Sequence, residues 1–167
     1  MKVTNDTLWL AFAPCVEYLK QGELDKITKA APNAVIGNGG YYVLTIAQLA
    51  AIINHNDVSV IVDKDVDDYT VYEYYTIQGL RNWFELFVKQ VEKLTIPTTA
   101  QEREASQACH EVTFIESLLL FAREYFSLHS FREAEEMTLA DVLLAKKDAY
   151  NKAAFQKAYS HIMSKRK

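Results

Sequence analysis

The chain has 167 residues, half of them hydrophobic, and its 18 Lys and Arg against 22 Asp and Glu give a formal net charge of −4. This hydrophobic fraction excludes wholesale disorder, and the acidic balance argues against nucleic-acid binding by the surface as a whole. Five Gly and three Pro are too few for a many-turned β-sandwich or barrel, whereas ten Tyr are an excess. We therefore expect one mainly α domain over residues 1–167, with no apolar run long enough to cross a membrane.

Residues 1–75 begin with helical patterns. Residues 6–20 place apolar side chains at helical spacing around Pro14, which should kink or shorten the helix. A second short helix is expected over 23–31 and should end at Pro32. No long apolar run follows the first residues, so we expect no secretory signal and a cytoplasmic protein, or one incorporated in a virion.

A glycine cluster then predicts a turn. Gly37 to Gly40 lie between two β-prone runs, 35–36 and 41–44, and this arrangement is typical of a hairpin. Thr45 and Gln48 follow at the spacing of a capping box, in which a hydroxyl and an amide satisfy two free backbone donors of a helix. We expect that helix to end near residues 54–56.

Two further runs favour strands. Val58 to Val62 is the strongest strand pattern in the chain, and Tyr69 to Tyr75 is a second candidate. The acidic stretch Asp63 to Asp68 separates them as a loop. Residues 1–75 are therefore predicted to form a small α+β unit with one or two hairpins.

Residues 76–167 predict three helices. The first carries an apolar stripe over 77–94 and is closed by Pro97. A second should run from Thr99 to about Leu128, and a third from Thr138 to the end of the chain, each opening at a capping pattern. Because the connections are short, the three helices should pack as an antiparallel bundle.

The second of these helices is apolar on two sides. One stripe runs from Ala105 to Phe126, and another lies about 200° around the helix at 100° per residue. Such a helix is either the buried centre of the fold or presents one stripe to a partner. The residues of the second stripe are Phe114, Leu118, Phe121 and Tyr125.

The sharpest chemical motif is acidic. Asp63, Asp65 and Asp67 alternate along the chain, and such carboxylates can converge on a hard cation. An EF-hand would require Gly at the sixth position and Glu at the twelfth, but Asp68 and Tyr74 stand there. The three carboxylates are thus weak candidates for a metal site, and a solvated loop is the favoured interpretation.

Other catalytic patterns are missing from the sequence. None of the four His follows a Glu by three residues, as di-iron bundles require, and no zinc, phosphate-loop or nucleophile-elbow spacing occurs. Cys15 and Cys109 are either free thiols of a reducing compartment or the two halves of one long-range disulfide. We therefore expect no enzymatic activity and no cofactor.

Charge is unevenly distributed. Residues 57–75 carry six acids and one Lys, whereas residues 138–167 carry seven Lys or Arg and two Asp. The two clusters can meet within one molecule or between copies in an oligomer. The basic tail could also contact nucleic-acid phosphates, but its aromatic residues stand at helix-packing positions, so we expect no nucleic-acid partner.

The leading hypothesis is a non-enzymatic protein–protein interaction or assembly protein that binds copies of itself or a larger partner. In general character the chain is similar to small assembly components of viruses (phages) and mobile elements. One alternative is a regulator or inhibitor that binds a partner through the acidic, Tyr-rich segment 57–75, and another is a metal binder or metal-dependent enzyme at the Asp motif. Besides the second stripe named above, the candidate interface residues are Tyr41, Tyr42, Tyr69, Tyr72, Tyr74 and Tyr75.

Overall fold

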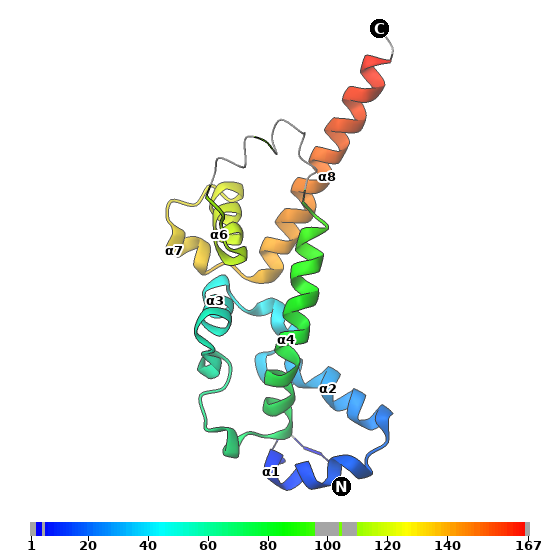
Figure 1. Ribbon diagram of the computed structural model, residues 1–167, viewed down its shortest axis with the longest axis vertical. Helices are drawn as coiled ribbons and strands as arrows, with labels where there is room; N and C mark the ends of the chain where they lie inside the picture. The colour runs from blue at the N-terminus through cyan, green and yellow to red at the C-terminus, as the bar shows by residue number, and fades with distance from the viewer. Residues whose placement is uncertain (1–2, 5, 96–103, 105–109, 166–167) are drawn as a thin grey trace. The chain divides into compact units, whose positions relative to one another are not determined.

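The computed structural model describes residues 3–4, 6–95, 104 and 110–165 (Figure 1). Over these residues the chain is mainly helical and has no strand, apart from an isolated antiparallel bridge between Leu8 and Thr70. The mainly α prediction is confirmed. The chain divides into two compact units, Met1–Leu86 and Phe87–Lys167, and the boundary between them lies inside a helix.

Unit 1 is built from short helices and the first part of a long one. Pro14 stands where an α-helix gives way to a 3-10 helix, as its missing N–H and fixed φ predict. The elements are α1 (Trp9–Phe12), η1 (Ala13–Tyr18), α2 (Gln21–Ile36), η2 (Gly40–Val43), α3 (Ile46–His55), η3 (Val58–Val60), η4 (Val66–Asp68) and α4 (Val71–Glu92), which continues into unit 2.

The hairpin predicted around the glycine cluster is wrong. The β-prone pair 35–36 forms the last turn of α2, which continues past Pro32, and residues 40–43 form η2. Gly37 and Gly39 have φ values of 110° and 107°, which L side chains rarely adopt, so the glycines turn the chain between two helical segments. The capping box of Thr45 and Gln48 is confirmed at the start of α3.

The two strands predicted after α3 are also absent. The Asp57 carboxylate accepts a hydrogen bond from the Ser59 backbone N–H at 3.1 Å, and this cap opens η3 where an extended run was expected. Thr70 and Glu73 form a reciprocal capping box, which starts α4 within the predicted second strand. Residues 1–75 are therefore helical rather than α+β.

Unit 1 is held together by an apolar core, which includes one buried polar side chain among the residues that the structure describes. Thr76 is fully buried, and its hydroxyl donates to the Tyr72 carbonyl at 2.8 Å. No buried side-chain oxygen or nitrogen in the described residues lacks a hydrogen-bond partner. The fully buried apolar side chains of this unit include Phe12, Ile46, Leu49 and Val71.

Unit 2 contains α6 (Phe114–Tyr125), α7 (Phe131–Glu135) and α8 (Leu139–Ser164) besides the end of α4. The long helix predicted over 99–128 is wrong in its bounds, because residues 110–113 are not helical and Thr113 opens α6 through a capping box with Glu116. The predicted cap at Thr99 and most of the first half of that segment lie outside the described residues. An antiparallel bundle of three helices stays a prediction.

Helix α8 begins where the sequence predicts. The Thr138 hydroxyl accepts from the Asp141 backbone N–H at 3.2 Å, which satisfies a free donor of the first turn. The first turns of α8 bury Leu139, Val142 and Leu143 with the apolar side of α6. The short helix α7, capped by Ser130, was not predicted.

Candidate interaction surfaces

The tyrosines after the glycine cluster pack inside unit 1. Tyr41 is 7% exposed, and its hydroxyl donates to the Thr76 carbonyl at 2.5 Å. Its ring lies 5.0 Å from that of Trp83, while Tyr42 meets the same indole edge-on at 5.4 Å. Burial raises the pKa of Tyr41 to about 12. These two residues therefore position η2 on α4 rather than form an exposed aromatic surface.

The tyrosines of the acidic, Tyr-rich segment hold the N-terminal segment in place. Tyr69 is buried, and its carbonyl accepts from the Trp9 N–H at 2.8 Å. The Trp9 ring stacks on Tyr74 at 3.5 Å between ring centroids and meets Tyr75 edge-on at 5.5 Å. Tyr72 is half-buried. Tyr74 and Tyr75 of α4 thus pack against the Trp9 ring rather than form a free aromatic surface.

The second stripe, which lies on α6, is buried in unit 2 at one residue and half-exposed at the other three. Leu118 is fully buried, and the Phe114 ring meets Phe87 edge-on at 6.2 Å. Phe121 lies under the Lys146 ammonium at 4.2 Å and stacks on Tyr125 at 5.4 Å. Burial against this surface lowers the pKa of Lys146.

Tyr125 also belongs to a polar network on the surface of α8. Its hydroxyl donates to the Asp148 carboxylate, and the Lys152 ammonium lies 2.6 Å from the same group. The hydrogen bonds from Lys152 and Tyr125 hold the pKa of Asp148 below its usual range. The network fixes the Tyr125 ring against α8.

The acidic motif surrounds an open hollow of about 460 Å³. Asp63 and Asp65 line it, whereas Asp67 does not. All three carboxylates are exposed, and Lys64 between them pairs with Glu73 at 2.7 Å. In the part of the chain that the structure describes, no three His, Cys, Asp or Glu side chains are arranged to hold a metal ion. The metal-binding hypothesis therefore gains no geometric support.

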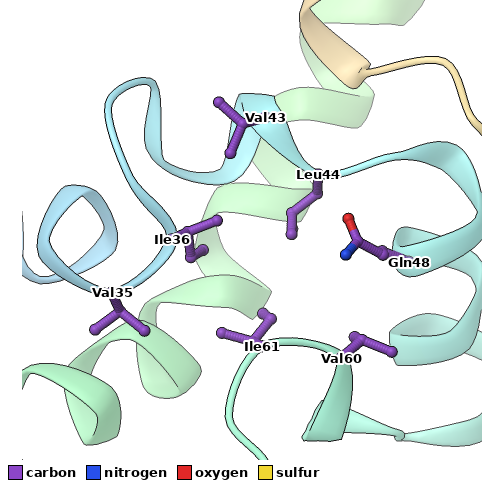
Figure 2. Close-up of a pocket in the computed structure, with 7 residues that line it drawn as sticks. All are labelled: Val35, Ile36, Val43, Leu44, Gln48, Val60 and Ile61. Atoms are coloured by element: carbon purple, nitrogen blue, oxygen red, sulfur yellow. The ribbon is translucent and has the colours of Figure 1, made fainter.

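A second hollow, of about 320 Å³, lies where α2, η2, α3 and η3 meet (Figure 2). Its walls are apolar except for Gln48, whose Oε1 accepts from the Thr45 N–H at 3.0 Å. The lining residues are Val35, Ile36, Val43, Leu44, Gln48, Val60 and Ile61.

Exposed apolar side chains of unit 2 lie on the second half of α8. Of residues 151–165 none is buried, and only Ala153 is half-buried. Phe155 is 69% exposed and Ile162 51%, and both lie on the same side of the helix as Leu144, which is 68% exposed. The candidate interface residues did not include these three. In the sequence, the spacing of these three residues indicates an exposed position, because it places them on the side of the helix away from Leu139, Val142 and Leu143.

A groove of about 400 Å³ continues this surface toward the end of α6. Tyr125 and Phe126 form one wall, and α8 contributes the other, with the side chains Asp141, Leu144, Ala145 and Asp148. Phe126 is 36% exposed and meets Tyr125 edge-on at 5.2 Å. Apolar walls with carboxylates at one side suit an apolar segment that also carries cations.

The comparisons with known proteins found no match: no family model, no curated protein and no solved structure resembles this chain. No helix among the described residues is long and apolar enough to cross a membrane.

Proposed function

We propose that this chain is a non-enzymatic assembly protein that functions by binding copies of itself. The observation that carries the proposal is the exposed apolar face of α8, to which Leu144, Phe155 and Ile162 contribute. Exposed apolar side chains along one side of a helix are typical of protein interfaces, because covering them removes hydrocarbon from water.

Packing against a partner would also stabilise the second half of α8. An isolated helix of about 15 residues is marginal in water, because the loss of backbone entropy nearly offsets its hydrogen bonds. Residues 151–165 bury no side chain among the described residues, so this segment receives little stabilisation from its own unit. Packing against another chain would supply it. A structural or assembly component of a virus or mobile element is the class of protein that we propose.

The test is the mass of the purified protein in solution. We expect light scattering to give a multiple of 19.1 kDa that falls toward the monomer only on strong dilution. A protein that remains monomeric over a wide concentration range would overturn the proposal of self-assembly.

A second candidate function is favoured by the acidic hollow of unit 1. Asp57, Asp63 and Asp65 line it, and a basic site of another protein would complement their charge. This regulator would lose its partner on charge reversal at Asp63 and Asp65, whereas reversal at exposed Asp25, away from the hollow, should leave binding unchanged. Equal binding by the two variants would exclude this candidate.

A further inference from the structure

We propose that two copies pair through α8 in antiparallel orientation, so that residues 151–165 of each copy, here called the tail, cover the groove of the other. This inference rests on the proposed self-assembly and identifies its interface. The groove is the one lined by Tyr125, Phe126 and four residues of α8, from Asp141 to Asp148.

Apolar side chains of the tail and of the groove lie on the same side of α8, with the polar side chains of Asp148 and Asn151 between them. At 100° per residue, Leu144, Phe155 and Ile162 fall within about 20° of one another around α8, and Tyr159 lies about 60° from Leu144. Tyr159 is 55% exposed, and its ring stacks on that of Phe155 at 6.1 Å. A partner helix laid along this face would cover the groove and the tail together.

The occupant of the groove cannot be the tail of the same copy. Figure 1 shows α8 as one continuous helix over Leu139–Ser164. Leu144 and Ile162 are 18 residues apart, which corresponds to about 27 Å at 1.5 Å per residue. The tail therefore points away from its own groove, and only a second chain can bring this segment to it.

Charge complementarity selects the antiparallel orientation. The tail contains Lys152, Lys157 and Lys165 but no Asp or Glu. At the groove, Asp148 already pairs with Lys152 of its own chain, so the carboxylates of Asp141 and of the exposed Glu124 would complement Lys157 and Lys165 of the other tail. In a parallel pair the basic tails would lie against each other, and their repulsion would oppose association.

The antiparallel arrangement also closes the assembly. Each copy offers one tail and one groove, and a two-fold axis near the middle of α8 satisfies both at once. With this axis Leu144 of one copy lies opposite Ile162 of the other. The exposed apolar side chains at the two ends of α8 then cover each other. The expected product is a dimer rather than an open filament.

The first experiment compares two double variants by light scattering. Phe155→Asp with Ile162→Asp, here called the stripe variant, places charge on the side of α8 that carries Leu144, Phe155 and Ile162. Ser160→Asp with Ser164→Asp, the serine variant, places the same charge on the opposite side of the exposed helix. We expect wild type and the serine variant to have twice the monomer mass and the stripe variant to have half that value. Circular dichroism and the thermal midpoint report whether unit 1 and the core of unit 2 stay folded in each variant.

The second experiment tests orientation by disulfide cross-linking in a background with Cys15→Ser and Cys109→Ser. A Leu144→Cys chain mixed with an Ile162→Cys chain should cross-link on oxidation, and neither chain should cross-link by itself. A parallel pair would show the reverse result. A wild type that is monomeric at every concentration overturns both the proposed function and this inference. An oligomer that survives the stripe variant, or that cross-links only like with like, overturns the inference alone.

Discussion

At the scale of single residues, Tyr41 connects two segments that are distant in the sequence. Its hydroxyl reaches the Thr76 carbonyl, 35 positions away, and its ring packs on Trp83 of the same helix. Gly79 makes this contact possible, because a Cβ at that position would lie 2.8 Å from the Tyr41 Oη. Absence of a side chain at Gly79 therefore serves packing rather than backbone conformation.

Tyr41→Phe should destabilise the protein by about 1 kcal/mol, the usual net contribution of one buried hydrogen bond. The variant should also change the pH dependence of stability. Because the pKa of folded Tyr41 is raised from 10.0 to about 12, its stabilising contribution is complete below pH 10 and is lost as pH rises toward 12. Urea unfolding of wild type should lose more stability across this range than the variant does. Tyr18→Phe, at a side chain 87% exposed, is the matched control and should change neither quantity.

Gly79→Ala should reveal the contact between Gly79 and Tyr41 in a double-mutant cycle. Alanine favours the helix by roughly 1 kcal/mol over glycine, but here its Cβ displaces the Tyr41 hydroxyl from Thr76. In the Tyr41→Phe background the displaced oxygen is absent, so the helix preference should appear almost in full. We expect a coupling of about 1 kcal/mol from urea unfolding of the four proteins. If the two substitutions change the free energy of unfolding additively, the proposed contact between position 79 and the Tyr41 hydroxyl is wrong.

At the scale of elements, α4 starts at a cap rather than at a change of hydrophobic pattern. The Thr70 N–H donates to Glu73 at 2.8 Å, and the Glu73 N–H donates to the Thr70 hydroxyl at 3.2 Å. Lys64 adds a hydrogen bond to the other Glu73 oxygen at 2.7 Å. Thr70, the carboxylate and the ammonium together direct the chain from the acidic loop into a helix.

Thr70→Ala should cost about 1 kcal/mol, since it removes the hydroxyl that satisfies the N–H of Glu73. Thr70→Ser keeps that hydroxyl and should retain most of the stability. Urea unfolding at neutral pH distinguishes the two variants. Equal loss in both would mean that the threonine methyl group, and not the cap, stabilises the start of α4.

Glu73 should make stability depend on acidity. Burial raises the pKa of Glu73, but hydrogen bonds from Lys64 and Thr70 together outweigh this and hold it below 4.5. The contribution of the carboxylate is therefore present above pH 4.5 and is lost as pH falls through the lower folded pKa. Glu73→Gln should be less stable at neutral pH and should lose less on acidification. Unfolding curves from neutral pH to pH 3 measure both effects, and parallel pH profiles would contradict the role of this carboxylate.

At the scale of the whole molecule, the chain consists of two compact units, each with its own buried residues. Phe12 is fully buried in unit 1 and Leu118 in unit 2. Neighbouring units with separate cores often open separately, since each opening exposes only its own apolar surface.

Leu118→Ala should therefore loosen unit 2 selectively. Truncation of a fully buried leucine costs about 2–5 kcal/mol, and hydrogen exchange should accelerate in α6 and the first turns of α8 while α2 and α3 remain protected. Phe12→Ala should give the opposite distribution. Uniform acceleration in both variants would show that the two units unfold as one.

Local features of this fold were predictable from the sequence, but nonlocal ones were not. The caps at Thr45 and Thr138 were predicted because the groups involved lie within three residues of each other. The strand predicted at Tyr69–Tyr75 is wrong because the cap at Thr70 starts a helix there, although aromatic residues favour strands. The clusters of tyrosine that predicted an interface at Tyr41 and Tyr69 are a feature of composition, which does not distinguish a tyrosine in the core from one on the surface.

The sequence by itself determined that this is a mainly helical protein with an acidic segment and a basic tail, because helix periodicity, caps and charge are properties of neighbouring residues. Only the tertiary structure decided that Tyr41 and Tyr69 are buried and that Phe155 and Ile162 are exposed. Burial depends on which distant segments meet, and no window of sequence contains that information. The tyrosine excess thus belongs largely to the packing of unit 1, and the surface available for assembly lies on α8.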